Sequence, residues 1–562
     1  KEIVLPGLPE GGDIVDWIET LHGDAAEPDG LRAEIEVLAQ AVEPEAIRIQ
    51  THTAGRCDGR MSQSELVVAL AMDAEYFHDV IGTTYATVRI GDHNETWPIH
   101  ARGFTLWLAG RFFELYRKPL NTEAIANAVR VLDYRARFEG PCQEVYRRVA
   151  PDGQGGVYID LGDPSWRAVH ITPNGWQIVR SPTVRFVRTP GMQPLPEPIS
   201  GGNLDALREI VNVPHNSAWA LVKAWLVSAI APTGPYPILV LRGEQGSAKS
   251  SLARTLRTLI DPAQPALRRP PREERDLAIA ARASWIIAYD NLSHLADWFS
   301  DALCTLATGG GFATRQLYSD FDEALFDFQR PVILNGITDF ISRDDLLDRA
   351  LIVELPRIPE ENRKDEASLS ATFRAQHGAL LGGLLDRLTG ALHEQLTLRL
   401  SRLPRMADFA RLAAAAERSE ARNGWSEATS VFLQAYQSVR AEAHEQAIEA
   451  CVAGPVLLQW LAQVCLPWRG AASDLLCELN RIADERQTHA KGWPKTAQHL
   501  GGIMRRLAPA LRHVGYIVDF DREGNAGRRT ITLSRISTTP EKTGKTLSAL
   551  SAMTDIRDFL QY

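Results

Sequence analysis

GEQGSAKSS, at Gly243–Ser251, is the stretch that decides the fold of this chain. It lies between an apolar run, PILVLR, and a run with helical spacing, LARTLRTLI. A buried strand that ends in a Gly-rich turn and continues into a helix directs backbone N–H groups at an anion. The spacing of Gly243, Lys249 and Ser250 follows the pattern G-x4-G-K-[ST], with Ala248 where a glycine is usual. The stretch therefore predicts a phosphate-binding loop.

The loop pattern also predicts a separate role for each of its polar residues. Lys249 is expected to reach the β- and γ-phosphates of ATP, and Ser250 to hold Mg²⁺. Ala248 is tolerable if its φ angle is negative, because a methyl group then adds little strain. The full nucleotide-binding set is Gly243, Glu244, Gln245, Gly246, Ser247, Ala248, Lys249, Ser250 and Ser251.

Two further buried runs end in polar residues that complete such a site. In SWIIAYDN the apolar run is followed by Asp290, a carboxylate placed to hold the Mg²⁺ shell, and in RPVILNG it is followed by Asn335, an amide that can orient the attacking water. Tyr289 and Asn291 flank Asp290, where a second acid is usual, so the water-activating base is left unassigned. An aspartate that only caps a strand is the alternative for Asp290.

An arginine precedes the next predicted strand, in SRDDLLDRALIVELP. Arg349 is expected to act as an arginine finger that crosses a subunit interface and stabilises transition-state charge. Arg343 is the second choice. The alternative for either arginine is a salt bridge with Asp344, Asp345 or Asp348.

Composition limits the class of protein. The chain has 562 residues, 45% of them apolar and 23% charged, so we expect a multidomain globular protein without a membrane span. No secretory signal pattern and no CxxC pair are seen, and the cytoplasm is the expected compartment. The net charge of −9 argues against a generally basic DNA-coating protein, but it allows a local basic face.

The alternation of strand-like and helix-like runs predicts a multidomain α/β architecture with a mostly parallel sheet. We expect a linker-containing start at 1–55, an α+β module at 56–200, a nucleotide-binding core at 201–365 and a helical region at 366–450. A Pro/Gly-rich run at 181–202 is expected to mark a domain boundary. Three helical runs and a hairpin at 451–536 predict a winged helix, and 537–562 a flexible tail.

The C-terminal region carries a local excess of positive charge. Residues 491–535 hold nine Lys or Arg and three Asp or Glu. The predicted recognition helix carries Lys495, Gln498, Arg505 and Arg506, and the predicted wing carries Arg528 and Arg529. DNA binding is the favoured interpretation, with a protein-docking winged helix as the alternative.

Residues 237–356 resemble the ATPase core of superfamily-3-type helicases of the AAA+ class, through GEQGSAKS, SWIIAYDN, TGGGFATRQLYSD, RPVILNG and LLDRALIVELP. The resemblance is closest to primase–helicase proteins of phages, plasmids and integrated elements. It implies a channel hairpin within Gly309–Gln329, where Arg315 is a candidate DNA contact. The expected hairpin tip, SDFDE, is acidic, which departs from the basic residues that phosphates attract.

The opening KEIVLPGLPEGGDIVDWIE resembles the end of a Toprim primase domain. The resemblance as a whole implies a Mg²⁺- and ATP-dependent DNA helicase of a mobile-element replication system. It also implies a homo-hexameric ring around single-stranded DNA, with a primase or polymerase as a further partner. One alternative is an AAA+ switch that binds an origin or remodels a nucleoprotein complex without unwinding. The other is a DNA-binding scaffold with a decayed ATP site.

Overall fold

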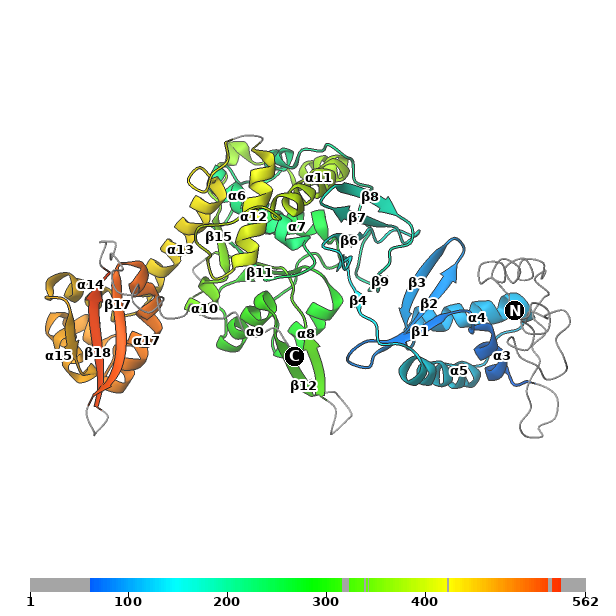
Figure 1. Ribbon diagram of the computed structural model, residues 1–562, viewed down its shortest axis with the longest axis horizontal. Helices are drawn as coiled ribbons and strands as arrows, with labels where there is room; N and C mark the ends of the chain where they lie inside the picture. The colour runs from blue at the N-terminus through cyan, green and yellow to red at the C-terminus, as the bar shows by residue number, and fades with distance from the viewer. Residues whose placement is uncertain are drawn as a thin grey trace, which may run out of the picture. The chain divides into compact units, whose positions relative to one another are not determined.

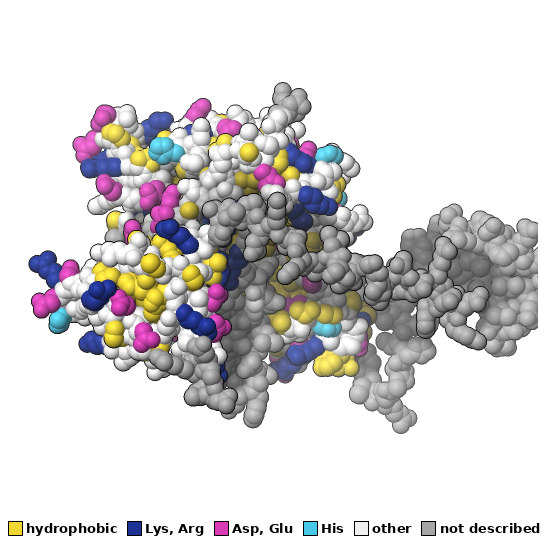
Figure 2. Space-filling view, turned by 60° about the vertical axis from the view of Figure 1, so that its left-hand side comes forward, with side chains coloured by type: hydrophobic (Ala, Val, Ile, Leu, Met, Phe, Trp, Pro, Cys, Tyr) yellow, Lys and Arg dark blue, Asp and Glu magenta, His cyan; other side chains and the backbone are white. Residues whose placement is uncertain are grey.

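The computed structural model describes residues 61–315, 323–337, 340–341, 343–421, 424–523 and 528–536. The expected Toprim-like start, the hairpin tip and the tail lie outside these residues. Within them, no helix combines the length and apolar character that a membrane crossing requires. Basic and acidic side chains are interspersed on the face shown in Figure 2.

A four-stranded parallel sheet forms the centre of the nucleotide-binding region (Figure 1). Its strands follow the order β11-β14-β10-β15. Both faces of a parallel sheet are usually covered, which explains why these strands read as continuous apolar runs in the sequence. All four were predicted, and their bounds are β10 Ile238–Arg242, β11 Ile287–Leu292, β14 Val332–Gly336 and β15 Ala350–Glu354.

A short extended segment continues the sheet beyond β11. Arg268 pairs in parallel with Tyr289, donating its N–H to the Ala288 carbonyl at 2.8 Å and accepting from the Asp290 N–H at 2.9 Å. In chain order, this segment falls between the first helix after the phosphate loop and β11. The order across the sheet is therefore the 268 segment, β11, β14, β10 and β15.

Helices and one hairpin surround this sheet. The hairpin pairs β12 Gly311–Arg315 with β13 Glu323–Asp327 in antiparallel register, in the interval where the sequence predicted a hairpin, and β12 lies against α8 (Figure 1). The helices of this region are a 3₁₀ turn Leu204–Glu209, α6 Asn216–Ala229, α7 Lys249–Ile260, α8 Glu274–Ala283, α9 Asp297–Thr308, α10 Asp344–Leu347 and a 3₁₀ turn Glu360–Asn362.

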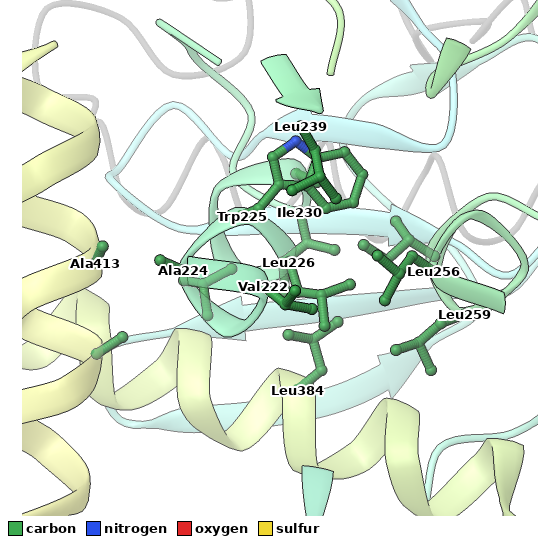
Figure 3. Packing of buried hydrophobic residues seen from close by; sticks show 14 of the residues in the cluster. Val222, Ala224, Trp225, Leu226, Ile230, Leu239, Leu256, Leu259, Leu384 and Ala413 are labelled. Carbon is green, nitrogen blue, oxygen red and sulfur yellow. The ribbon is translucent and has the colours of Figure 1, made fainter. Parts of the chain in front are cut away.

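The largest core is built around α6 (Figure 3). Trp225 and Leu226 on α6 are 1% and 0% exposed, and side chains of β10, α7, α11 and α12 surround them. The three long helices of the predicted helical region contribute to the same core, so 366–450 packs directly onto the nucleotide-binding region. They are α11 Glu366–Glu394, α12 Ala407–Glu420 and α13 Val431–Ala450.

The structure divides the expected 56–200 module into two parts. The first has its own core and consists of α3 Gln63–Leu70, β1 Glu75–His78, β2 Thr84–Ile90, β3 His93–Pro98, α4 Arg102–Tyr116, α5 Thr122–Tyr134 and a π-helical turn Arg135–Glu139. The second is an antiparallel sheet, β5-β6-β7-β8, whose Ile159 and Ile171 join the core around α6. Its strands and neighbours are β4 Val145–Tyr146, β5 Val149–Pro151, β6 Val157–Asp160, β7 Ala168–Thr172, β8 Gly175–Val179 and β9 Arg185–Phe186.

The end of the 181–202 run, which was predicted to be a linker or domain boundary, is packed into the body of the protein. Leu195 is 5% exposed, and the Ile199 N–H donates to the Gly378 carbonyl of α11 at 2.9 Å. Added Cβ atoms at Gly378, Gly382 and Gly383 would lie 2.7, 1.7 and 2.6 Å from carbonyl oxygens of residues 197, 199 and 202. The glycines of α11 therefore form a track that admits this backbone.

The C-terminal region, 454–535, folds around a three-stranded antiparallel sheet of order β16-β18-β17. Three helices before a hairpin were predicted; the structure adds a short strand after the first helix and a fourth short helix. The elements are α14 Gly454–Gln463, β16 Trp468–Gly470, α15 Ala472–Ile482, α16 Glu485–His489, α17 Ala497–His513, β17 Tyr516–Glu523 and β18 Arg528–Arg535.

Replacing Gly382 by alanine tests the α11 track. The new methyl group would meet the Ile199 carbonyl, so the segment must move, and we expect Gly382→Ala to lower the free energy of unfolding by about 2 kcal/mol or more. Thermal unfolding followed by circular dichroism measures the change. Gly110→Ala in α4 is the control, because a Cβ there meets nothing within 4 Å. Equal melting temperatures for the two variants would contradict the track.

Candidate functional site

The phosphate loop connects β10 to α7 through three residues with positive φ. Gly243, Gly246 and Ala248 have φ angles of 147°, 86° and 63°. A negative φ at Ala248, the condition under which alanine adds little strain, is not met, because this residue is left-handed immediately before the helix starts. Such a conformation costs a non-glycine residue roughly 1 kcal/mol. The loop thus keeps its turn in spite of the alanine.

Packing explains why the loop starts with glycine. A Cβ at Gly243 would lie 2.5 Å from the Leu355 carbonyl and 2.8 Å from the Ser247 hydroxyl. Ser247 is fully buried, and its hydroxyl donates to the Glu244 carbonyl at 2.9 Å. These contacts give the loop a defined shape against the end of β15.

Lys249 lies inside the curve of this loop. Its Nζ donates to the carbonyls of Gly243 and Glu244 at 2.7 and 2.8 Å and lies 3.3 Å from the Ser247 hydroxyl. Burial lowers the pKa of the ammonium below its ordinary value, although the nearby Asp290 carboxylate opposes this shift. The loop therefore places one positive charge at the N-terminal end of α7, where helix N–H groups favour an anion.

The polar residues at the strand ends meet next to Lys249. The Ser250 hydroxyl donates to Asp290 Oδ1 at 2.8 Å. Asn291 has a φ of 60°, and its N–H donates to Asn335 Oδ1 at 3.0 Å. Asn335 is 1% exposed, and its Nδ2 has no hydrogen-bond partner among the described residues. The residues predicted from three separate motifs thus share one edge of the sheet. They are Lys249, Ser250, Asp290 and Asn335.

Arg349 lies at the opposite end of the strands, where β10 and β15 begin. Its carbonyl accepts from the N–H of Ile238, the first residue of β10, whereas Lys249 follows the last residue of that strand. The side chain donates to the Asp345 carbonyl and carboxylate at 2.7 and 2.5 Å, which is the salt bridge named as its alternative. Arg343 pairs with Asp301 at 2.7 Å. In a single chain, Arg349 therefore lies away from the phosphate loop.

Arg349 belongs to a charged cluster that extends to the C-terminal region. Arg405 lies 3.0 Å from Asp345 and 3.2 Å from Asp348. Burial raises the pKa of the Asp345 carboxyl, but the hydrogen bond and charge of Arg349 and those of Arg405 outweigh it, so the net pKa is low. His444 of α13 lies 3.5 Å from Asp348.

The His444 ring stacks on His513 of α17, with ring centroids 3.8 Å apart. Burial lowers the pKa of His444 to about 4, with His513 and Arg440 adding to the shift and Asp348 opposing it. The pKa of His513 is lowered as well, again mainly by burial. The stacked pair is therefore neutral near pH 7 and ties α13 to the C-terminal region.

A cavity of about 780 Å³ opens beside the phosphate loop. It lies between Gly246, α7, residues 209–212 and residues 356–374. Asn212 crosses its wall, because its Nδ2 donates to the Ser247 carbonyl at 3.1 Å and to the Pro356 carbonyl at 2.7 Å. Sequence reasoning did not find these residues, since they carry no motif and come together only in the fold. Five basic residues line the cavity, Arg254, Arg357, Arg363, Lys364 and Arg374.

The predicted DNA-binding residues fall into three groups. Arg505 and Arg529 are exposed and line a groove of about 610 Å³ in the C-terminal region. Lys495 and Arg506 are exposed outside that groove. Arg315 is the last residue of β12, and Arg528 is the first residue of β18. The side chains of both lie outside the described part of the structure.

Two family models match the chain. Residues 204–432 match the model described as the actinomycete integrative conjugative element replication protein, and residues 454–546 match the AICE RepA C-terminal domain. Together the two regions cover more than half of the 562 residues. These matches connect the chain with the replication of mobile genetic elements. No curated protein matches the chain.

Solved structures with a related arrangement include the apo A form of the NrS-1 C-terminal region, with TM-score 0.36 and 11% identity over 84% of this chain and 98% of that one. JCV helicase, solved with a bound phenoxyphenyl acetamide, has TM-score 0.20 and 12% identity over 43% of this chain and 70% of that one. Similarity at this level carries no functional conclusion.

Changing Ala248 tests the loop conformation. We expect Ala248→Gly to keep nucleotide binding and to raise the unfolding free energy by roughly 1 kcal/mol, because glycine adopts the 63° φ without strain. Ala248→Val places a β-branched side chain at positive φ and should weaken binding at least tenfold. Titration with a fluorescent ATP analogue gives the affinities. Equal binding by the valine variant would show that the left-handed turn is not required.

The stacked histidines predict a dependence of stability on pH. The folded-state pKa of His444 is about 4, below its ordinary 6.5, so the unfolded chain binds a proton first as the pH falls. Stability should therefore be full above the ordinary pKa and decrease between these two values. The melting temperature of His444→Asn should fall less on acidification than that of the wild type. His393→Asn, at an exposed position of α11, is the control and should behave like the wild type.

Proposed function

We propose that this chain is an ATP-hydrolysing DNA helicase or translocase that serves the replication of a mobile element. The observation that carries the proposal is the meeting of Lys249, Ser250, Asp290 and Asn335 at one edge of the sheet. A lysine for phosphates, a hydroxyl–carboxylate pair for a metal and a buried amide for water are the groups that phosphoryl transfer needs. The family matches supply the replication context.

ATP with Mg²⁺ fits the donors of this site. Ser250 and Asp290, 2.8 Å apart, offer two hard oxygen ligands and would hold the metal, which would neutralise charge on the phosphates. The buried Nδ2 of Asn335 has no described partner and is available to a water molecule or a phosphate oxygen. The cavity beside the loop, with apolar and basic walls, has room for the base and ribose.

The sheet supports an AAA+-type core of the superfamily-3 kind. The segment at Arg268 lies next to β11. If the five extended segments of this sheet are numbered in chain order, their order across the sheet is 2-3-4-1-5. In chain order, the hairpin of β12 and β13 comes after the strand of Asp290 and before the strand of Asn335, as in the resembling helicases. In this proposal, the hairpin reaches single-stranded DNA in a central channel, with Arg315 as a contact.

The position of Arg349 supports a site shared between subunits. Its backbone borders the start of β10, one strand length away from Lys249, so it does not reach its own phosphate loop. An arginine on that edge can serve a neighbouring chain instead, as arginine fingers do. A head-to-tail arrangement of this kind closes into a ring, and a homo-hexamer is the proposed assembly.

The C-terminal region supports a winged helix that binds duplex DNA. Its order of α14, β16, α15, α17, β17 and β18 places a long helix before a hairpin, and the exposed Lys495, Arg505, Arg506 and Arg529 supply positive charge. The proposal includes a primase or polymerase as a further partner at the replication site.

ATP hydrolysis with and without single-stranded DNA tests the proposed function. We expect DNA to stimulate the wild type, and we expect Lys249→Ala and Arg349→Ala each to lower the rate roughly 10²-fold or more, because each removes charge stabilisation of the transition state. Mixing the two inactive variants should restore part of the rate. Random assembly joins an intact lysine to an intact arginine at about one interface in four.

Arg343→Ala tests the second choice for the finger, because it removes a neighbouring ion-paired guanidinium. A rate near that of the wild type is the expected result, whereas a loss as large as that of Arg349→Ala would assign the role to Arg343. Recovery on mixing excludes a site completed within one chain. Hydrolysis that DNA does not stimulate would instead favour an ATP-driven switch that remodels a nucleoprotein complex. Binding of DNA with no hydrolysis at all would favour a scaffold with a decayed site.

A further inference from the structure

The groove of about 610 Å³ in the C-terminal region lies between α17 and the β17–β18 ribbon. Its lining includes Gln498, Gly501 and Arg505 from the helix and Phe520, Arg522 and Arg529 from the strands. The N-terminal end of α15 contributes Ser473. Of these residues, Gln498, Arg505 and Arg529 were singled out from the sequence as candidate DNA contacts.

Three arginines give the groove its charge. Arg522 and Arg529 are directly opposite each other in the antiparallel register, and both are exposed. Like charges at opposed positions destabilise a strand pair. Arg505 lies over the Phe520 ring at 5.4 Å. Among the described residues, none of the three arginines forms an ion pair with a carboxylate, so the repulsion is not compensated within the described part of the fold.

Gly501 lies inside α17, where glycine weakens a helix relative to alanine. A Cβ built on Gly501 or on its neighbour Gly502 meets nothing within 4 Å, so no packing among the described residues requires either glycine, and of the two only Gly501 lines the groove. The space that its missing side chain leaves opens into the groove. A helical glycine facing open space is expected where another backbone approaches closely.

Thr530 adds an unsatisfied polar group to the same groove. It lines the groove, is 6% exposed, and its hydroxyl has no hydrogen-bond partner among the described residues. Buried hydroxyl groups are normally paired. The groove thus presents three arginines against one carboxylate, that of Asp521, together with one unpaired hydroxyl and one bare stretch of helix backbone.

We propose that this groove binds the phosphodiester backbone of DNA, with Gly501 kept small so that the backbone can approach α17. Arginine matches phosphate geometry with paired N–H donors, and bound phosphates would relieve the repulsion between Arg522 and Arg529. This inference rests on the proposed DNA-binding function of the C-terminal region and assigns it a specific surface.

A protein partner fits the groove less well. Docking of a protein usually requires an apolar centre that the free surface exposes. Among the described residues of 454–536, the exposed large hydrophobic side chains are Phe520 and Ile536. Phe520 already lies under Arg505. Charge, rather than apolar area, therefore dominates this surface.

Gly501→Gln in the full-length chain tests the proposal. Glutamine favours helix and adds no charge, so we expect a melting temperature equal to or a few degrees above that of the wild type. The longer side chain fills the groove, and the affinity for DNA should fall roughly tenfold or more. Fluorescence anisotropy with a labelled random-sequence duplex, and separately with a single strand, measures binding without ATP and shows which form of DNA the groove prefers.

Gly110→Gln is the matched control, since it also replaces a helical glycine whose Cβ would meet nothing within 4 Å. It should leave DNA affinity unchanged. Arg522→Gln should weaken binding, reduce the slope of log affinity against log salt by about 1, and not lower the melting temperature. These effects do not depend on how Gly501→Gln folds.

If Gly501→Gln and Arg522→Gln bind both forms of DNA with wild-type affinity, the proposal is overturned. This holds even if the groove is then found to bind an acidic protein. ATP hydrolysis is measured on the same variants. Stimulation by single-stranded DNA together with unchanged binding in both variants would reject the groove and retain the motor. Absence of DNA binding and of stimulation in the wild type would reject both.

Discussion

The loop between β10 and α7 must turn with positive φ at three of six positions and still hold a lysine inside its curve. The rest of the nucleotide-binding region depends on this constraint. The strand before the loop is buried on all of its residues, so the loop starts from a fixed point. The end of β15 presses on Gly243, and Asn212 ties the loop to the segment after β15. The strand, the loop and the cavity wall are therefore held together by direct packing and hydrogen bonds.

Much of this region could be predicted from the sequence because its signals are local. Parallel strands read as apolar runs, and the residues that end them, such as Asp290 and Asn335, follow at once in the chain. The structure brings these residues to one edge because parallel strands share a direction. Ala248 shows the limit of such reasoning. The sequence could state only that alanine is tolerable there at negative φ, and the turn required by both ends of the loop determined a positive angle instead.

Other features could not be predicted because they depend on contacts between distant segments. The sheet of β5–β8 is polar enough at its turns to read as part of an N-terminal module, yet its apolar face completes the core around α6. The cavity beside the loop is lined by residues from three separate stretches, and only the stretch that contains the loop carries a motif. Arg349 was recognised from its place before β15, but its pairing with Asp345 in the single chain was only one of several alternatives.

The glycine track of α11 has a consequence for how this protein can vary. The segment it holds makes contact through carbonyl oxygens of residues 197, 199 and 202, which every amino acid provides. Side chains along the segment can therefore change without loss of the contact, whereas each of the three glycines tolerates no larger residue. In a set of related chains, a segment that looks hypervariable would be fastened by a helix that hardly changes. An alignment that scored only the segment would mistake an anchored part of the fold for an expendable one.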